Sequence, residues 1–250
     1  MNISLVRRGM LAAGAALLLT GGLPPVAEAQ NKVPLRISTP AVPDDWHAKM
    51  WTVFKESLDK SAPGEFDVQI NLNATLFKQG TEPAAMARGN LELATISAFD
   101  IAKLVPEFSI FTAGYIIRDP DHMQKVFNGP IGEQFNETLV KARGMRILGT
   151  TYYGTRHITT TAKAVRTPAD MVGFKLRVPE NDVFKAMAEA WGAKPTPMNF
   201  GELYLALKQN VVDGQENPLP TIKSGKFDEV QKYLVLSGHI ITPRLVVVNE

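Results

Sequence analysis

The chain has 250 residues, of which 45% are hydrophobic, and a formal net charge of +2. This balanced charge contains no basic block and gives no sign of a nucleic-acid or anionic-membrane partner, while the apolar content suffices for one large or two small cores. The sequence has no cysteine, which excludes disulfides, thiolate nucleophiles, cysteine-bound zinc, iron–sulfur clusters and lipid attachment at a signal-peptide cysteine.

Residues 1–29 have the pattern of a secretory signal peptide. Arg7 and Arg8 form a basic segment, and an apolar run that is short for a membrane span follows them. Ala27, Glu28 and Ala29 fit the small-x-small cleavage rule. We therefore expect export to the periplasm and a mature chain that starts at residue 30 and is not tethered. The paired arginines match a twin-arginine signal only in part, so Sec and twin-arginine export both stay open, with an uncleaved anchor as the alternative.

Strand and helix patterns alternate in the first half of the mature chain. Apolar alternation predicts strands at 33–39, 66–73, 91–97 and 145–151. Helices are predicted at 46–60, 81–89 and 121–143. The first of these helices has an apolar stripe made of His47, Met50, Trp51, Phe54 and Leu58. This order indicates a parallel sheet with helices packed on it.

The pattern then restarts with a second α/β unit. Further strands are predicted at 159–161, 174–178, 194–198, 234–236 and 244–248. One helix is predicted to be capped by Asp182, and the next by Asn199 with Glu202 in a capping box. We therefore expect an α/β fold with a first lobe (residues 30–154 and 242–250) and a second lobe (residues 155–241). Strands that cross directly between the lobes would form a hinge.

The sequence shows no catalytic or metal-binding motif. The histidines are His47, His122, His157 and His239, and none has a partner at metal-ligand spacing. The run from Asp119 to His122 is predicted to be a turn with a helix cap. We expect neither an enzyme, nor a cofactor, nor a metal site.

Three polar residues near the ends of predicted elements could bind an anion instead. Arg156 precedes a threonine-rich strand, Arg177 ends the strand at 174–178, and Asn217 lies where Gly214 and Pro218 indicate a loop. A guanidinium can grip a carboxylate through two hydrogen bonds, and an amide can add an orienting one. Periodicity alone favours the alternative, in which both arginines are solvated charges on the outer face of a strand.

Four long motifs closely resemble the substrate-binding proteins of tripartite ATP-independent periplasmic (TRAP) transporters of the DctP type. They are GTRHITT (154–160), ADMVGFKLRVPEND (169–182), PTPMNFGELYLALKQNVVDGQENPLPT (195–221) and KFDEVQKYLVLSGHI (226–240). The resemblance extends over nearly the whole mature chain. It implies a two-lobe periplasmic binding protein, type II-like, that closes around an organic acid.

The resemblance also implies which residues bind the ligand. Arg177 would form the salt bridge with the ligand carboxylate, supported by Asn217 and Arg156, and Phe200 would form a wall. In the first lobe the match is looser. By position it points to Trp46 or His47, to Lys78 and Gln79, and to Ser97.

Two of these positions bear on the ligand. The sialic-acid-binding branch has a carboxylate where Ser97 stands, which argues against sialic acid. Lys78 would favour a second acidic group if it faced the cleft, although a solvated loop lysine is the alternative.

The resemblance implies transport rather than sensing. We expect a monomeric periplasmic protein that delivers its ligand to TRAP membrane permease subunits. A sensor module that presents the same ligand to a receptor is the alternative, and a periplasmic enzyme is disfavoured. Family members continue beyond the residue that matches Glu250. We therefore expect a fragment or a truncated gene whose product is poorly stable.

Overall fold

The computed structural model describes residues 32–250, which form one compact unit built on a single eight-stranded sheet. The strand order across the sheet is β2-β1-β3-β8-β4-β7-β5-β6. The strands are β1 (Val33–Ser38), β2 (Phe66–Asn71), β3 (Leu93–Ser97), β4 (Met145–Thr160), β5 (Lys175–Val178), β6 (Lys194–Pro197), β7 (Gly214–Pro218) and β8 (Tyr233–Asn249). The mixed α/β fold expected from the sequence is therefore confirmed.

Eight α-helices and three short 3₁₀ segments connect the strands within residues 32–250. The α-helices are α1 (Trp46–Ser61), α2 (Glu82–Met86), α3 (Ala98–Ile101), α4 (Pro120–Phe127), α5 (Pro130–Arg143), α6 (Asp182–Ala190), α7 (Phe200–Lys208) and α8 (Leu219–Ser224). The 3₁₀ segments are Pro106–Thr112, Pro168–Met171 and Phe227–Glu229. None of the helices in this part of the chain has the length and apolar character needed to cross a bilayer.

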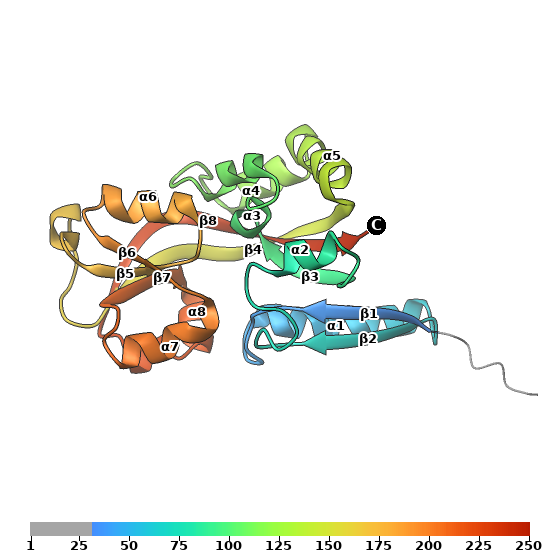
Figure 1. Ribbon diagram of the computed structural model, residues 1–250, viewed down its shortest axis with the longest axis horizontal. Helices are drawn as coiled ribbons and strands as arrows, with labels where there is room; N and C mark the ends of the chain where they lie inside the picture. The colour runs from blue at the N-terminus through green and yellow to red at the C-terminus, as the bar shows by residue number, and fades with distance from the viewer. Residues whose placement is uncertain (1–31) are drawn as a thin grey trace, which may run out of the picture. The chain divides into compact units, whose positions relative to one another are not determined.

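Strands β4 and β8 are the longest elements of the sheet and pair with each other in antiparallel fashion. In Figure 1 they run side by side across the middle of the molecule, from the strands β5–β7 to the strand β3. The sequence pattern predicted two separate strands in each of these segments, and this was wrong. Register shifts near Gly149 and Gly154 let β4 continue through residues that read as breaks.

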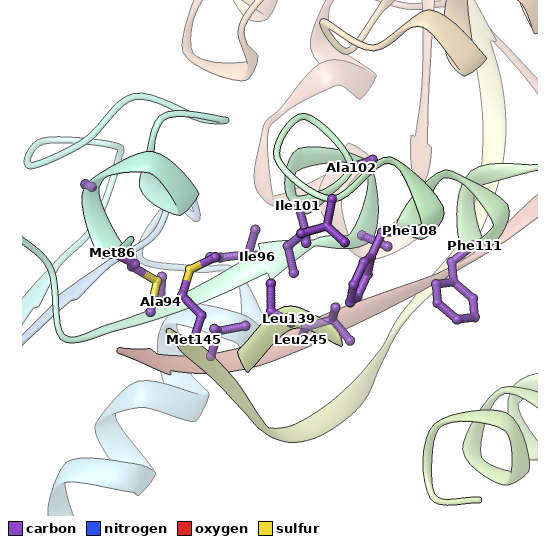
Figure 2. Close-up of a cluster of buried hydrophobic side chains, with 14 of the residues drawn as sticks. Met86, Ala94, Ile96, Ile101, Ala102, Phe108, Phe111, Leu139, Met145 and Leu245 are labelled. Carbon is purple, nitrogen blue, oxygen red and sulfur yellow. The ribbon is translucent and has the colours of Figure 1, made fainter. Parts of the chain in front are cut away.

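The largest hydrophobic core joins α2, β3, α3 and α5 to the far halves of β4 and β8. Figure 2 shows Met86 and Ile101 facing Leu139, Met145 and Leu245 in this core. Each such fully buried aliphatic side chain stabilises the fold by about 1.5–3 kcal/mol. Two further cores form on β5 with α6 and on α7 with α8, and a fourth packs α1 on β1 and β2.

The N-termini of the helices show which of the predicted capping residues make cap hydrogen bonds. Asp45 caps α1 as its position suggests, and Asp119 caps α4, which confirms the predicted turn and cap. The helix α6 is capped by Asn181 and not by Asp182. Asn199 precedes α7 but makes no side-chain cap, so the predicted capping box there is wrong; its amide donates to Glu180 instead.

The arrangement of the strands does not test where the predicted boundary between the two lobes lies. The signal peptide predicted at residues 1–29 lies outside the described residues. Since β4 and β8 each run through the proposed boundaries near residues 154 and 242, the residue bounds of the two lobes stay a prediction.

Candidate functional site

A small cavity of about 20 Å³ lies where residues of the predicted first and second lobes meet. A space of this size holds roughly one water molecule. Three arginines line it, together with one carboxylate, two side-chain amides and several apolar or aromatic groups. The lining residues are Pro40, Ala41, Asp45, Gln79, Phe99, Tyr153, Arg156, Arg177, Pro179, Phe200, Asn217 and Arg244.

Arg177 reaches the cavity from β5, which lies inside the sheet between β6 and β7. Its neighbours Leu176 and Val178 are fully buried in the core, and Arg177 itself is only 1% exposed on the opposite face. Its Nε and Nη2 atoms both donate to the carbonyl oxygen of Met198, at 3.0 and 2.6 Å. The other donors of the guanidinium have no protein acceptor in residues 32–250 and are free to hold a ligand.

Burial dominates the electrostatics of Arg177. It lowers the pKa of the guanidinium to about 10, with the nearby charge of Arg156 acting in the same direction and Glu216 opposing it. At neutral pH the group is therefore still a cation, held in a site from which water is largely excluded. An anion placed there is attracted more strongly than it would be in solvent.

Arg156 occupies the cavity wall next to Arg177 but is already held by a carboxylate. Its Nε and Nη2 atoms donate to the two carboxylate oxygens of Glu216, the second at 2.7 Å. Nη2 also donates to Asn217 Oδ1 at 3.1 Å, and the guanidinium lies 5.2 Å from the ring centroid of Phe184. Only Nη1 of this side chain has no acceptor among the described residues, so Arg156 positions Asn217 and can supply one further donor group.

Glu216 is the centre of this buried network, a role that its place in the sequence does not predict. Burial alone would raise the pKa of its carboxyl group, but the charge of Arg156 and the hydrogen bond with His239 outweigh burial and lower the pKa. His239 Nε2 lies 3.1 Å from Glu216 Oε2, and both side chains are fully buried. Glu216 thus neutralises Arg156 and leaves Arg177 without a protein counter-ion.

Asn217 lies on a strand and not in a loop, which corrects the prediction from Gly214 and Pro218. The strand β7 pairs with β4 in antiparallel fashion and with β5 in parallel fashion. The amide of Asn217 donates to Gln215 Oε1 at 2.6 Å and accepts from Arg156, so its orientation is fixed on both sides.

Phe200 lines the cavity at the first turn of α7. Its backbone N–H donates to Gln79 Oε1 at 3.1 Å, and its ring lies 5.8 Å from that of Phe227. The predicted wall position therefore faces the site, and Gln79 reaches it from the predicted first lobe.

Lys78 and Ser97, both suggested for the first lobe, lie outside the cavity lining. Lys78 is exposed, while its neighbour Gln79 lines the cavity. Ser97 is fully buried, its hydroxyl has no hydrogen-bond partner among residues 32–250, and it pairs with Arg244 in the register of β3 and β8.

Trp46 and His47 also lie outside the cavity lining. Trp46 borders a separate hollow beside Tyr152 and Leu219. The buried ring of His47 lies 3.5 Å from the ring of Trp46 and 4.3 Å from that of Tyr153, between centroids. His47 contributes indirectly, because its Nδ1 atom lies 3.0 Å from the carboxylate of Asp45, which does line the cavity.

Arg244 and Asp45 are the charged cavity residues that the sequence analysis did not predict. Arg244 stands in the strand pattern RLVVVN as an isolated charge, and Asp45 reads as a helix cap. An arginine at the entry of an otherwise apolar strand was the only available signal, and it does not reveal which distant residues it meets.

No group of three or more possible metal ligands is found among residues 32–250. The cavity lining brings several hydrogen-bond donors, mainly guanidinium groups, close together around one small volume. This arrangement suits the binding of an oxygen-rich anion.

The profile of a protein family described as "Bacterial extracellular solute-binding protein, family 7" (DctP) matches residues 38–250. A solute-binding protein from Verminephrobacter eiseniae is 36% identical over 224 residues, which cover 90% of this chain and 67% of that protein. The chain belongs to this family. Its members are solute-binding proteins rather than enzymes, so the recognition made from the sequence motifs is confirmed.

Solved structures agree with this assignment. A TRAP periplasmic solute-binding protein from Roseobacter denitrificans, solved with bound 3-deoxy-D-manno-oct-2-ulosonic acid, superposes with a TM-score of 0.82 at 37% identity, covering 88% of this chain and 72% of that one. One from Sulfurospirillum deleyianum with bound succinate gives a TM-score of 0.83 at 32% identity, covering 88% and 70%. The two-lobe binding-protein fold expected from the sequence is thereby confirmed.

This chain spans only part of the length of its relatives. The match covers 67% of the Verminephrobacter eiseniae protein and 60% of two further curated relatives. The transport activity of a whole family member is therefore a proposal for this chain.

Proposed function

We propose that this protein captures a small organic carboxylate in the periplasm and delivers it to the membrane permease of a TRAP transporter, without chemical change to the ligand. The observation that carries the proposal is the state of Arg177. Its guanidinium is 1% exposed, lines the cavity, and has no carboxylate within ion-pair distance among residues 32–250.

A carboxylate ligand would supply the missing counter-ion. Two parallel N–H···O bonds from a guanidinium to a carboxylate combine charge with fixed geometry. The amide of Asn217 and the free Nη1 group of Arg156 lie on the same cavity wall and would hold the second side of the carboxylate. The ligands bound to the two solved relatives, an ulosonic acid and succinate, both carry such a group.

Ligand entry requires the cavity to open, because about 20 Å³ does not admit an acid of several carbon atoms. Four hydrogen bonds connect cavity-lining residues or their neighbours across the predicted lobes: Asn181 to the carbonyl of Phe99, the amide of Phe200 to Gln79, Ser224 to Asp45, and Thr221 to the hydroxyl of Tyr153. Each contributes only about 0.5–1.5 kcal/mol. A hinge motion that breaks them would admit the ligand, and ligand contacts to both lobes would favour the closed state.

The test is removal of the anchoring guanidinium. Truncating one member of a buried ion pair costs roughly 3–5 kcal/mol, so Arg177→Ala should weaken binding of any carboxylate ligand by about two to four decades. Arg177→Lys should also fail substantially, because an ammonium group cannot reproduce the two-pronged contact. The measurement is isothermal titration calorimetry of the full chain against a panel of organic acids.

Arg118→Ala, at an exposed arginine, is the matched control and should bind as the wild type does. If Arg177→Ala binds within threefold of the wild type, the proposed site is wrong.

A further inference from the structure

Arg244 interrupts an apolar strand face. In β8, Val246 and Val248 pack with Trp51 in the core between α1 and the sheet. Arg244 stands two residues before Val246, so its side chain continues the same face of the strand. Burying an unpaired charge at the edge of such a face costs folding free energy. A buried arginine there is therefore expected to have a hydrogen-bonding partner.

No protein acceptor is found for this guanidinium among the described residues. Arg244 is 7% exposed and lines the cavity, and its guanidinium carbon lies 4.4 Å from the ring centroid of Tyr153. A cation over an aromatic face leaves the in-plane N–H groups unused. These donors therefore remain for a molecule that enters the cavity.

Asp45 lies on the same side of the cavity and supplies an acceptor. Its Oδ1 atom accepts from the backbone N–H of His47 at 2.9 Å and lies 3.0 Å from the His47 ring, while Oδ2 accepts from Ser224 at 3.2 Å. These contacts fix the carboxylate and leave about one of its four lone-pair positions unused. No ion pair joins Asp45 to Arg244 within the described residues.

The net charge of the cavity lining can be balanced by one negative group on the ligand. Arg156 and Glu216 neutralise each other, so the lining keeps the charges of Arg177, Arg244 and Asp45, a net +1. Behind the lining, Asp100 is paired with Lys103 at 3.4 Å. One ligand carboxylate on Arg177 balances this charge. A second carboxylate would add a buried negative charge close to Asp45.

A hydroxyl group satisfies both Arg244 and Asp45, because it accepts from the guanidinium and donates to the carboxylate. We propose that Arg244 and Asp45 form the part of the cavity lining that binds ligand hydroxyl groups, while Arg177 binds the carboxylate, and that the ligand is a hydroxylated monocarboxylic acid of the sugar-acid class rather than a dicarboxylic acid. This rests on the proposed function, which places the ligand carboxylate on Arg177. Arg244, and not Lys78, is then the first-lobe cation that determines specificity.

The test compares two ligand classes on five proteins. D-galactonate and D-erythronate represent the sugar acids, and succinate represents a dicarboxylate without hydroxyl groups. The full-length wild type should bind at least one sugar acid about tenfold or more tightly than succinate. Arg244→Met should weaken sugar-acid binding by about 10- to 100-fold and succinate binding by less than about threefold, since only the sugar acids lose hydrogen bonds to a charged group.

Asp45→Asn should change the affinities for the two ligand classes in opposite directions. Asparagine still caps a helix, so α1 keeps its start, but the negative charge is lost. This variant should weaken sugar-acid binding and strengthen succinate binding. Arg244→Gln keeps hydrogen-bond donors and should retain more sugar-acid affinity than Arg244→Met. This comparison distinguishes a loss of hydrogen bonds to the ligand from a loss of packing.

Two results would overturn this inference and leave the proposed function intact. One is a wild type that prefers succinate to both sugar acids. The other is an Arg244→Met protein whose affinities for all ligands change by the same factor. Arg177→Lys, the fifth protein, tests the proposed function separately, because it should lose affinity for every acid in the panel.

Discussion

His47 shows how a residue can shape the site without touching the cavity. Its ring is buried between Trp46 and Tyr153, and its Nε2 atom has no hydrogen-bond partner within residues 32–250. Burial lowers the pKa of the imidazole to about 4, although the hydrogen bond with Asp45 acts in the opposite direction. The folded protein therefore holds His47 neutral, with Nδ1 directed at Asp45.

This neutral state predicts a loss of stability in acid. The pKa of His47 is about 4 in the folded chain and 6.5 in the unfolded chain, so its contribution is fully present above pH 6.5 and is lost as pH falls toward 4. Relative to His47→Gln, the wild type should lose about 3 kcal/mol of unfolding free energy across this window. Urea unfolding of both proteins at several pH values measures the difference.

The comparison with the variant is necessary because burial also raises the pKa of Glu82 to about 7, which acts in the opposite direction in both proteins. A difference between wild type and variant that does not change with pH would show that His47 titrates alike in both states.

At the scale of elements, β7 explains why part of the site was misread. Every residue of this strand is buried, and its side chains Gln215, Glu216 and Asn217 are all polar. A strand buried on both faces shows no alternation, and polar residues between Gly214 and Pro218 suggest a loop. Neighbouring strands satisfy the polar groups instead: Thr159 accepts from Gln215, and Arg156 donates to Glu216.

Replacing the buried acid of this strand should destabilise the protein strongly. Glu216→Gln keeps the shape but leaves Arg156 buried without a counter-ion, at a cost of roughly 3–5 kcal/mol in unfolding free energy. The same change at Glu137, whose partner Lys141 lies 3.5 Å away on the exposed face of α5, should cost less than about 1 kcal/mol.

Urea unfolding at neutral pH measures both variants. Equal effects of the two substitutions would mean that the buried network contributes no more than a surface ion pair.

Much of the element pattern follows from the sequence, because it depends on local periodicity. The strands β1, β2, β3 and β5 and the helix α1 lie close to where alternation and capping signals predict them. The long strands β4 and β8 do not, since glycine and polar residues within them read as breaks. Their continuity comes from pairing with each other, which no local window contains.

At the scale of the whole molecule, closure around the ligand depends on a few weak contacts between the predicted lobes. Ser224 donates to Asp45 at 3.2 Å but does not line the cavity. Ser224→Ala should therefore weaken ligand binding by about 2- to 10-fold, since one hydrogen bond of the closed state is lost. The change should lie mainly in the dissociation rate, measured by stopped-flow fluorescence.

Ser61→Ala is the matched control, because this hydroxyl bonds only to carbonyls of its own helix, those of Ser57 and Leu58. An unchanged dissociation rate in Ser224→Ala would show that this contact does not hold the closed state.

The sequence by itself determined the family, most of the elements and the position of Arg177, because long motifs and local periodicity belong to contiguous residues. The tertiary structure decided what Arg177 faces. Glu216 takes Arg156 as its partner, while Asp45, Gln79 and Arg244 come from elements far away in the chain to complete the cavity. Periodicity states which face of a strand is covered, whereas the residues that cover it are chosen by packing and pairing between distant segments.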